Sequence, residues 1–74
     1  MNGDDVVGAV LAAFHGDDAD ALRVALHPYL HWTTADGTRI RGRRNVLVLL
    51  ATRTALPPPA AYELRDGQVY RWYE

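Results

Sequence analysis

Two Asp-Gly pairs, each lying between strand-like runs, constrain the fold of this chain more than any other feature. The pairs are Asp36-Gly37, between runs at 31–34 and 38–41, and Asp66-Gly67, between runs at 62–65 and 68–72. Asp-Gly in this setting is the strongest short hairpin signal, because both central residues of a type I′ turn need positive φ. The sequence therefore predicts two β-hairpins.

Apolar residues at helical spacing predict a first helix before these hairpins. Its buried stripe runs from Val6 to Phe14 with a spacing of three and four residues. Asp4 or Asp5 is expected at the N-cap, where a carboxylate meets the positive end of the helix. Gly16 is expected to end the helix in a left-handed conformation.

Two further helices are expected. The second is short: Asp17 or Asp18 caps it, and it runs through Leu26, because Pro28 forces the residue before it out of the α region. The third begins near Arg43, after the first hairpin, and the three consecutive prolines that follow it form an extended linker. The resulting order, α-α-β-β-α-β-β, predicts an α+β roll with three helices packed on a short, twisted antiparallel sheet.

The register of the last hairpin predicts what each face of the sheet carries. With a two-residue turn, one face carries the pairs Leu64–Val69 and Tyr62–Arg71, and the other carries Glu63–Tyr70 and Ala61–Trp72. Helices cover only one face of such a sheet, so the second face would expose aromatic rings to a partner. We therefore expect a homodimer, with this interface: His31, Glu63, Tyr70 and Trp72.

Length and composition favour assembly and exclude several classes of protein. A single domain spanning 1–74 buries only about 60% of its unfolded surface, so oligomerisation would add needed stability. The chain has no cysteine, which excludes disulfides and thiolate metal sites. All eight basic residues are arginine, a bias typical of GC-rich genomes such as those of actinobacteria. No targeting or membrane-spanning segment is evident, so a soluble cytoplasmic protein is expected.

The order of these elements resembles the NTF2-like superfamily, in its SnoaL-like, polyketide-cyclase-like branch. The resemblance is carried by these segments: Gly16-Asp17, His27-Pro28-Tyr29-Leu30-His31-Trp32, Asp36-Gly37, Arg41-Gly42-Arg43, and Glu63 through Trp72. It implies an NTF2-like, or cystatin-like, roll with a cone-shaped cavity between sheet and helices. Members of the family are usually longer, and the segment 56–60 replaces their additional strands. The chain therefore looks like a minimal member whose cavity is shallower or open on one side.

Candidate residues for acid–base chemistry are few. Relatives that act as ketosteroid isomerases carry a carboxylate near the end of the first strand, where this chain has Thr33 and Thr34. The remaining candidates are His31, Asp36 and Tyr62. On a strand, His27 and His31 would lie about 13 Å apart, too far to share one zinc ion. No metal and no cofactor are expected.

The basic residues around Gly42 are not expected to form a nucleic-acid site. Arg39, Arg41, Arg43 and Arg44 have no aromatic residues interleaved, and the net charge of the chain is −1. A solvated strand and helix start explain this cluster.

Aromatic and apolar side chains predict a ligand pocket between the helices and the sheet. Its expected lining is Leu11, Phe14, Trp32, Leu50, Tyr62, Leu64 and Arg71. The alternative is that these side chains are simply the core of a small protein. The sequence thus predicts a non-catalytic protein that binds a small apolar ligand, or an accessory protein. The first alternative is a cyclase, isomerase or dehydratase of the SnoaL-like kind, and the second is a structural interaction module.

Overall fold

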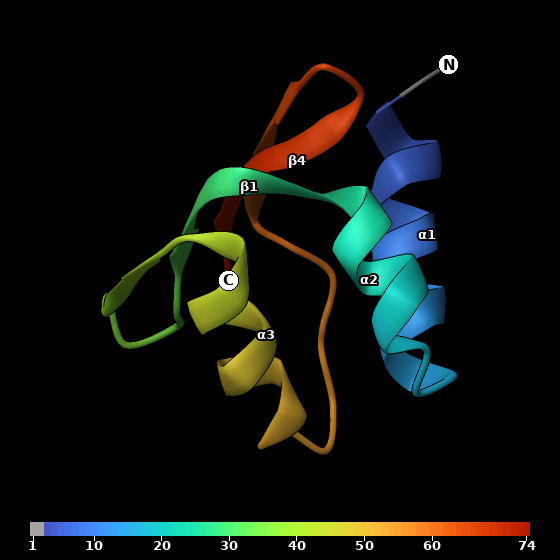
Figure 1. The fold of residues 1–74 in the computed structure, drawn as a ribbon. Coiled ribbons are helices and arrows are strands. Elements are labelled where there is room, and N and C mark those ends of the chain that lie inside the picture. Colours follow the sequence, from blue (N-terminus) through green and yellow to red (C-terminus); the bar gives the residue numbers. More distant parts are fainter. Residues whose placement is uncertain (1–2) are drawn as a thin grey trace.

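A computed structural model describes residues 3–74, and its helices and strands follow the predicted order (Figure 1). The elements are α1 (Gly3–His15), α2 (Ala19–Ala25), β1 (Leu26–Thr33), β2 (Arg39–Arg41), α3 (Arg43–Ala51), β3 (Ala61–Arg65) and β4 (Gln68–Tyr73). Figure 1 shows α1 and α2 packed side by side, and α3 lies farther from α1 but contacts α2, where Arg43 donates to the carbonyl of Arg23. The α+β fold is therefore as expected. None of the helices within residues 3–74 is long and apolar enough to cross a membrane.

Helix α1 ends differently from the prediction, because Asp17 and not Gly16 takes the left-handed conformation, with φ of 55°. The N–H of Asp18 donates to the carbonyl of Ala13, and the N–H of Asp17 donates to that of Phe14. This is the Schellman arrangement, which satisfies carbonyls at the helix end. Aspartate tolerates positive φ, so glycine is not required there.

The predicted caps of the first two helices had different outcomes. Asp18 caps α2 by accepting a hydrogen bond from the N–H of Ala21 at 3.1 Å, as one of the two alternatives predicted. Because α1 begins at Gly3, Asp4 and Asp5 lie inside its first turn and not at its N-cap. The position before Gly3 lies outside the described residues.

The two Asp-Gly turns are not alike. Asp66 and Gly67 both have positive φ, at 55° and 76°, so the second hairpin has the predicted type I′ turn. In the first hairpin only Gly37 has positive φ. The N–H of Gly37 donates to the carbonyl of Thr34, and Thr34 pairs with Thr38, which leaves a loop of three residues. Three-residue loops combine a type I turn with one left-handed residue, and Gly37 supplies it.

The sheet is mixed, where a purely antiparallel sheet was expected. Its strand order is β2-β1-β4-β3, and the central strands β1 and β4 are parallel. Each Asp-Gly turn indicates strand pairing only within its own hairpin. These local signals therefore did not predict how the strands of one hairpin pair with those of the other. Helix α3 lies between the hairpins in the chain, and crossovers of this kind allow parallel pairing.

A β-bulge at Tyr70 corrects the predicted register of the second hairpin. Leu64 pairs with Val69 as expected, but the next pairs are Glu63–Arg71, Tyr62–Trp72 and Ala61–Tyr73. The extra residue on β4 exchanges the faces of Arg71 and Trp72 relative to the prediction. Trp72 consequently lies fully buried with Val69 on the inner face of the sheet, and Arg71 lies on the outer face. The expected exposure of Trp72 at a dimer interface is therefore wrong.

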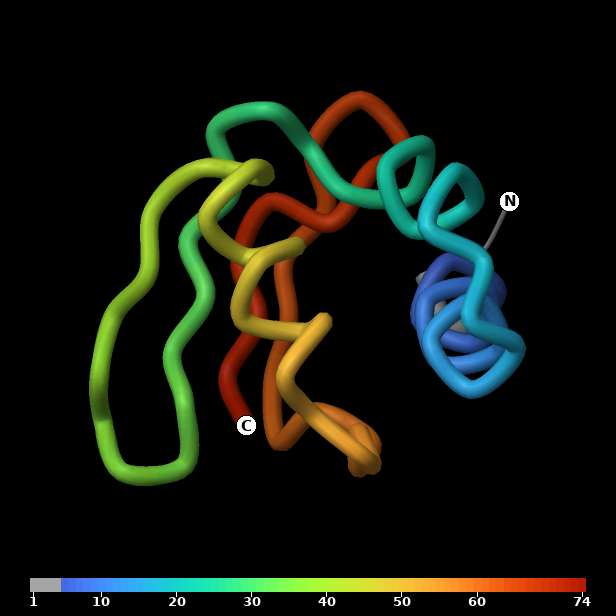
Figure 2. Tube along the Cα trace, turned by 60° about the horizontal axis from the view of Figure 1, so that its bottom comes forward, coloured from blue at the N-terminus to red at the C-terminus, as the bar shows by residue number. Residues whose placement is uncertain are grey.

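The core centres on a stacked pair of indoles. Trp32 and Trp72 are register partners on β1 and β4, and their rings lie parallel with centroids 4.8 Å apart. Both side chains are fully buried. The fully or nearly buried residues around them are Val6, Val10, Ala13, Leu22, Leu26, Leu30, Val46, Leu50, Leu56 and Val69. Figure 2 shows the first hairpin extending away from α1, so the helices cover only part of the sheet.

Two glycine substitutions are expected to change stability in opposite directions. Gly67→Val places a β-branched residue at φ of 76°, and we expect a loss of about 1–2 kcal/mol in the free energy of unfolding. Gly8→Ala lies within α1, where an added Cβ meets nothing within 4 Å, and should gain about 0.5–1 kcal/mol. Urea unfolding followed by circular dichroism measures both. Equal stability of Gly67→Val and the parent would contradict the observed turn.

Candidate functional site

A cavity of about 350 Å³ lies between the three helices. Its apolar wall consists of Phe14 from α1, Leu22 from α2, and Leu47, Leu50 and Ala51 from α3. Helical spacing explains this lining, because Leu50 and Ala51 lie three and four residues after Leu47 and so share one side of α3. The polar residues at its margin are His15, Asp17, Arg53 and Thr54.

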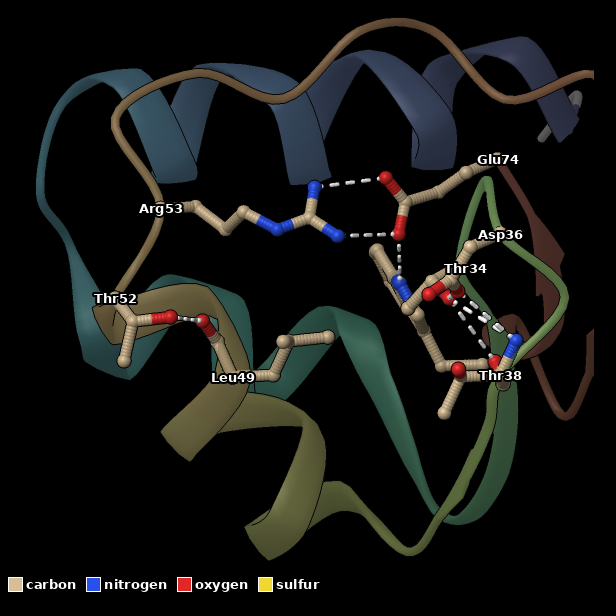
Figure 3. Close-up of polar contacts among 8 residues, drawn as sticks. Thr34, Asp36, Thr38, Leu49, Thr52, Arg53 and Glu74 are labelled. Atoms are coloured by element: carbon tan, nitrogen blue, oxygen red, sulfur yellow. Dashed lines mark hydrogen bonds and ion pairs between the residues drawn. The ribbon is translucent and has the colours of Figure 1, made fainter.

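Arg53 and Glu74 form an ion pair beside this cavity (Figure 3). The Nη1 and Nη2 atoms of Arg53 donate to the Oε1 and Oε2 atoms of Glu74 at 2.7 and 2.8 Å, in a bidentate arrangement. The indole Nε1 of Trp32 also donates to Oε2 of Glu74, at 2.8 Å. The Glu74 side chain is only 3% exposed, and that of Arg53 is 27% exposed. This network links the segment after α3, strand β1 and the residue that follows β4.

Both members of the pair are charged. The hydrogen bonds from Arg53 lower the pKa of the Glu74 carboxyl, against the effect of burial, and the indole of Trp32 lowers it further. The hydrogen bonds to Glu74 raise the pKa of Arg53. An ionised carboxylate that is already paired is a poor proton acceptor near neutral pH.

Asp36 lies in a second, more open hollow, which Arg53 and Glu74 also line. This hollow has a volume of about 510 Å³, and its other lining residues are Thr34, Ala35, Thr38, Ile40 and Leu49. The Asp36 carboxylate accepts hydrogen bonds from the Thr34 hydroxyl and, at 3.1 Å, from the N–H of Thr38 (Figure 3). These bonds, the one from Thr34 most, lower the pKa of Asp36. Arg53 therefore lies at the border of two hollows, where it pairs with Glu74 and lines the second hollow together with Asp36.

The structure brings together only part of the predicted pocket. Phe14 and Leu50 line the cavity, whereas Leu11 packs against the core. Trp32 lies beneath the site in the stacked pair, and reaches it through its bond to Glu74.

The residues predicted from the second hairpin lie elsewhere. Leu64 packs on the core from the edge strand β3. Tyr62 lies on the same strand, where it pairs with Trp72 of β4 and is 36% exposed. Arg71 points to the outer face, where its Nε lies 3.3 Å from Oε2 of Glu63. The bulge at Tyr70 is the reason, because it moved Arg71 away from the helices.

The three candidates for acid–base chemistry do not form a cluster. Asp36 lines the second hollow, whereas His31 lies on the outer face of the sheet, its ring edge-on to Tyr70 at 5.5 Å. Tyr62 lies on β3. Among residues whose side chains are described, no group of three His, Asp or Glu residues could hold a metal ion.

Sequence reasoning missed the central pair of the site. Arg53 lies just beyond the end of α3, in line with the buried residues Val46 and Leu50, and a cation in such a position favours a counterion nearby. That signal was readable. Its partner was not, because Glu74 is 21 residues away in the chain and reaches Arg53 only through the parallel pairing of β1 and β4.

Comparisons with known proteins identify the fold. No family model matches the sequence, and no curated protein matches it. Among solved structures, an LEH-like epoxide hydrolase of Mycobacterium tuberculosis is similar, with a TM-score of 0.72 and 21% identity over 93% of this chain and 77% of that one. An NTF2-like protein of unknown function from Cytophaga hutchinsonii gives a TM-score of 0.78 at 10% identity, over 99% and 88% of the two chains.

A protein from Pseudomonas putida that is provisionally named a polyketide cyclase gives a TM-score of 0.77 at 14% identity, over 99% of this chain and 90% of that one. Such neighbours are consistent with the resemblance to the SnoaL-like branch. At these identities the likeness concerns the fold and not the chemistry. The chain has the NTF2-like fold.

Proposed function

We propose that this protein binds a small, largely apolar molecule in the cavity between the three helices, without transforming it. The observation that carries the proposal is the cavity itself, in which apolar side chains from three helices form the wall and Arg53 provides a polar margin. Its volume of about 350 Å³ falls within the range of small-molecule sites, which combine apolar walls with a few polar groups.

The state of the nearby carboxyl groups supports binding over catalysis. A general base works best with a pKa near the operating pH, yet Asp36 and Glu74 both have lowered pKa values. Each carboxylate is also already held by hydrogen bonds, Glu74 by Arg53 and Trp32 and Asp36 by its own turn.

A cavity-filling variant tests the proposal. We expect cyclohexyl methyl ketone at millimolar concentration to shift the amide NMR signals of Phe14, Leu22 and Leu50 in the parent protein. Leu47→Trp fills the cavity and should abolish these shifts. Val48→Trp is the matched control, because Val48 is 63% exposed on the same helix and does not line the cavity. Shifts that survive in Leu47→Trp would contradict the proposal.

One observation favours acid–base catalysis as a second candidate. Asp36 lines a hollow together with Arg53, so a substrate there would meet both a carboxylate and a guanidinium. Hydrolase and cyclase names among the structural neighbours fit this alternative. If this alternative is correct, Asp36→Asn should abolish turnover of a carbonyl or epoxide substrate. The amide NMR shifts caused by a ligand in the cavity between the helices should remain in this variant.

We also propose that the protein forms a homodimer through the outer face of the sheet. His31, Glu63 and Tyr70 of the predicted interface lie on this face, although Trp72 does not. Exposed aromatic rings support the proposal: Tyr29 is 75% exposed and Tyr73 is 40% exposed. A chain of this size also gains stability from buried intersubunit area.

A further inference from the structure

We propose that the second copy docks about a two-fold axis parallel to the strands, between β1 and β4, so that Glu63 of each copy faces Arg41 of the other. This inference rests on the proposed homodimer and goes beyond it by naming the axis and the pairing. It follows from the order of charges across the outer face of the sheet.

A single row of side chains crosses all four strands on that face. His31 on β1 is paired with Arg41 on β2 and with Arg71 on β4, and Arg71 is paired with Glu63 on β3. Register partners share a face, so the row reads Arg41, His31, Arg71, Glu63 from one edge of the sheet to the other. Trp32 and Ile40, the next register pair, belong to the inner face.

The side chains of this row are available to a second copy. Arg41 is exposed, and the side chains of Arg71 and Glu63 are 49% and 55% exposed. His31 is half-buried because its ring contacts Tyr70. The 3.3 Å pair between Arg71 and Glu63 leaves one Glu63 carboxylate oxygen for another cation.

The two ends of the row, Arg41 and Glu63, are complementary when the row is reversed. Two sheets that pack face to face as copies are related by a two-fold axis lying between them. An axis along the strands reverses the row, so Glu63 faces Arg41 and Arg71 faces His31. An axis across the strands does not reverse it, so Arg41 faces Arg41 and Glu63 faces Glu63. Like charges placed opposite each other are unfavourable, and the order of charges therefore selects the axis along the strands.

The position of this axis also suits the shape of the sheet. The strand order is β2-β1-β4-β3, so an axis between β1 and β4 passes through the middle of the sheet. Each strand of one copy then lies over a strand of the other, with β2 over β3 at both edges. A partner of uniform charge would complement only part of the row, because three of its positions are cationic or titratable and the fourth is anionic.

Charge reversal with a matched control tests the pairing. The dissociation constant of the parent is measured by sedimentation equilibrium beside Arg41→Glu, Glu63→Arg, the double variant and Arg39→Glu. Each single reversal occurs twice in the dimer, and we expect it to weaken assembly about tenfold or more. The double variant restores opposite charges and should return to within about threefold of the parent. Circular dichroism confirms that each variant is folded.

Arg39→Glu is the control because it changes the same charge on the same strand outside the row. The neighbouring row on the outer face consists of Arg39, Thr33, Tyr73 and Ala61. The two-fold axis along the strands therefore places Arg39 of one copy opposite the uncharged Ala61 of the other. In Glu63→Arg the new arginine also repels its intrachain neighbour Arg71. The double variant contains the same repulsion, so the difference between these two dissociation constants reports only the contact between the copies.

The outcomes separate the inference from the dimer proposal on which it rests. A dimeric parent whose double variant is no tighter than the single variants overturns the pairing and leaves the dimer standing. The same holds if Arg39→Glu weakens assembly as much as Arg41→Glu. With the axis across the strands, like charges face each other in every variant, so none should differ from the parent. A parent that stays monomeric at millimolar concentration overturns the homodimer itself.

Discussion

Replacing Trp72 with alanine is expected to lower the free energy of unfolding by about 3–5 kcal/mol, a large share of the stability of a domain of this size. The indole is fully buried and stacks on Trp32 at 4.8 Å, so truncation removes the contact at the centre of the core and leaves a cavity. Urea unfolding followed by circular dichroism measures the loss.

Two further variants separate the possible roles of Trp72. Val48→Ala, at a position of α3 that is 63% exposed, should change stability by less than about 1 kcal/mol. Trp72→Phe should cost less than Trp32→Phe, because the Nε1 of Trp72 has no hydrogen-bond partner in the described part of the chain, whereas that of Trp32 binds Glu74. Weakened assembly at unchanged stability in Trp72→Ala would instead place this indole on the outer face.

The second large effect is expected for Arg53→Met, which should destabilise the protein by about 3–5 kcal/mol. The substitution leaves the Glu74 carboxylate, 3% exposed, without the guanidinium that pairs with it. The double variant Arg53→Met/Glu74→Gln removes both charges and keeps an amide oxygen that can accept the hydrogen bond of Trp32 Nε1, so we expect it to recover most of this loss. A double variant no more stable than Arg53→Met would contradict this account.

The pair also predicts how stability depends on pH. The pKa of Glu74 is lower in the folded protein than its ordinary value of 4.5. Its stabilising contribution is therefore complete above that ordinary value and is lost as the pH falls through the folded pKa. The parent should thus lose stability below about pH 4.5 more steeply than the double variant, as urea midpoints between pH 7 and pH 3 can measure.

The fold was largely predictable because its signals are local. Helical stripes, the cap at Asp18 and the two Asp-Gly turns each depend on a few neighbouring residues. The predictions that were wrong depend on contacts between distant segments of the chain. The bulge at Tyr70 reverses the faces of Arg71 and Trp72, and its cause is the need to bury Val69 and Trp72 together, three residues apart on one strand. Strict alternation cannot place both on one face.

The site was predictable only in its apolar part. Phe14 and Leu50 were expected to face a pocket because they lie on the buried stripes of their helices. The polar margin depends on contacts between distant segments, as in the pair of Arg53 with Glu74. Such contacts follow from how the two hairpins meet, and neither turn sequence contains that information.

The parallel pairing of the two central strands has a consequence for how the chain folds. Strand β1 ends at Thr33 and its neighbour β4 begins at Gln68, so the middle of the sheet cannot close until both hairpins and the helix between them have been synthesised. Until then the indole of Trp32 lacks its stacking partner Trp72. Long-range pairing of this kind slows folding, because a large loop must close before any contact rewards it. The pairing of β4 with β1 is thus the step that completes the core, because it brings Trp72 onto Trp32.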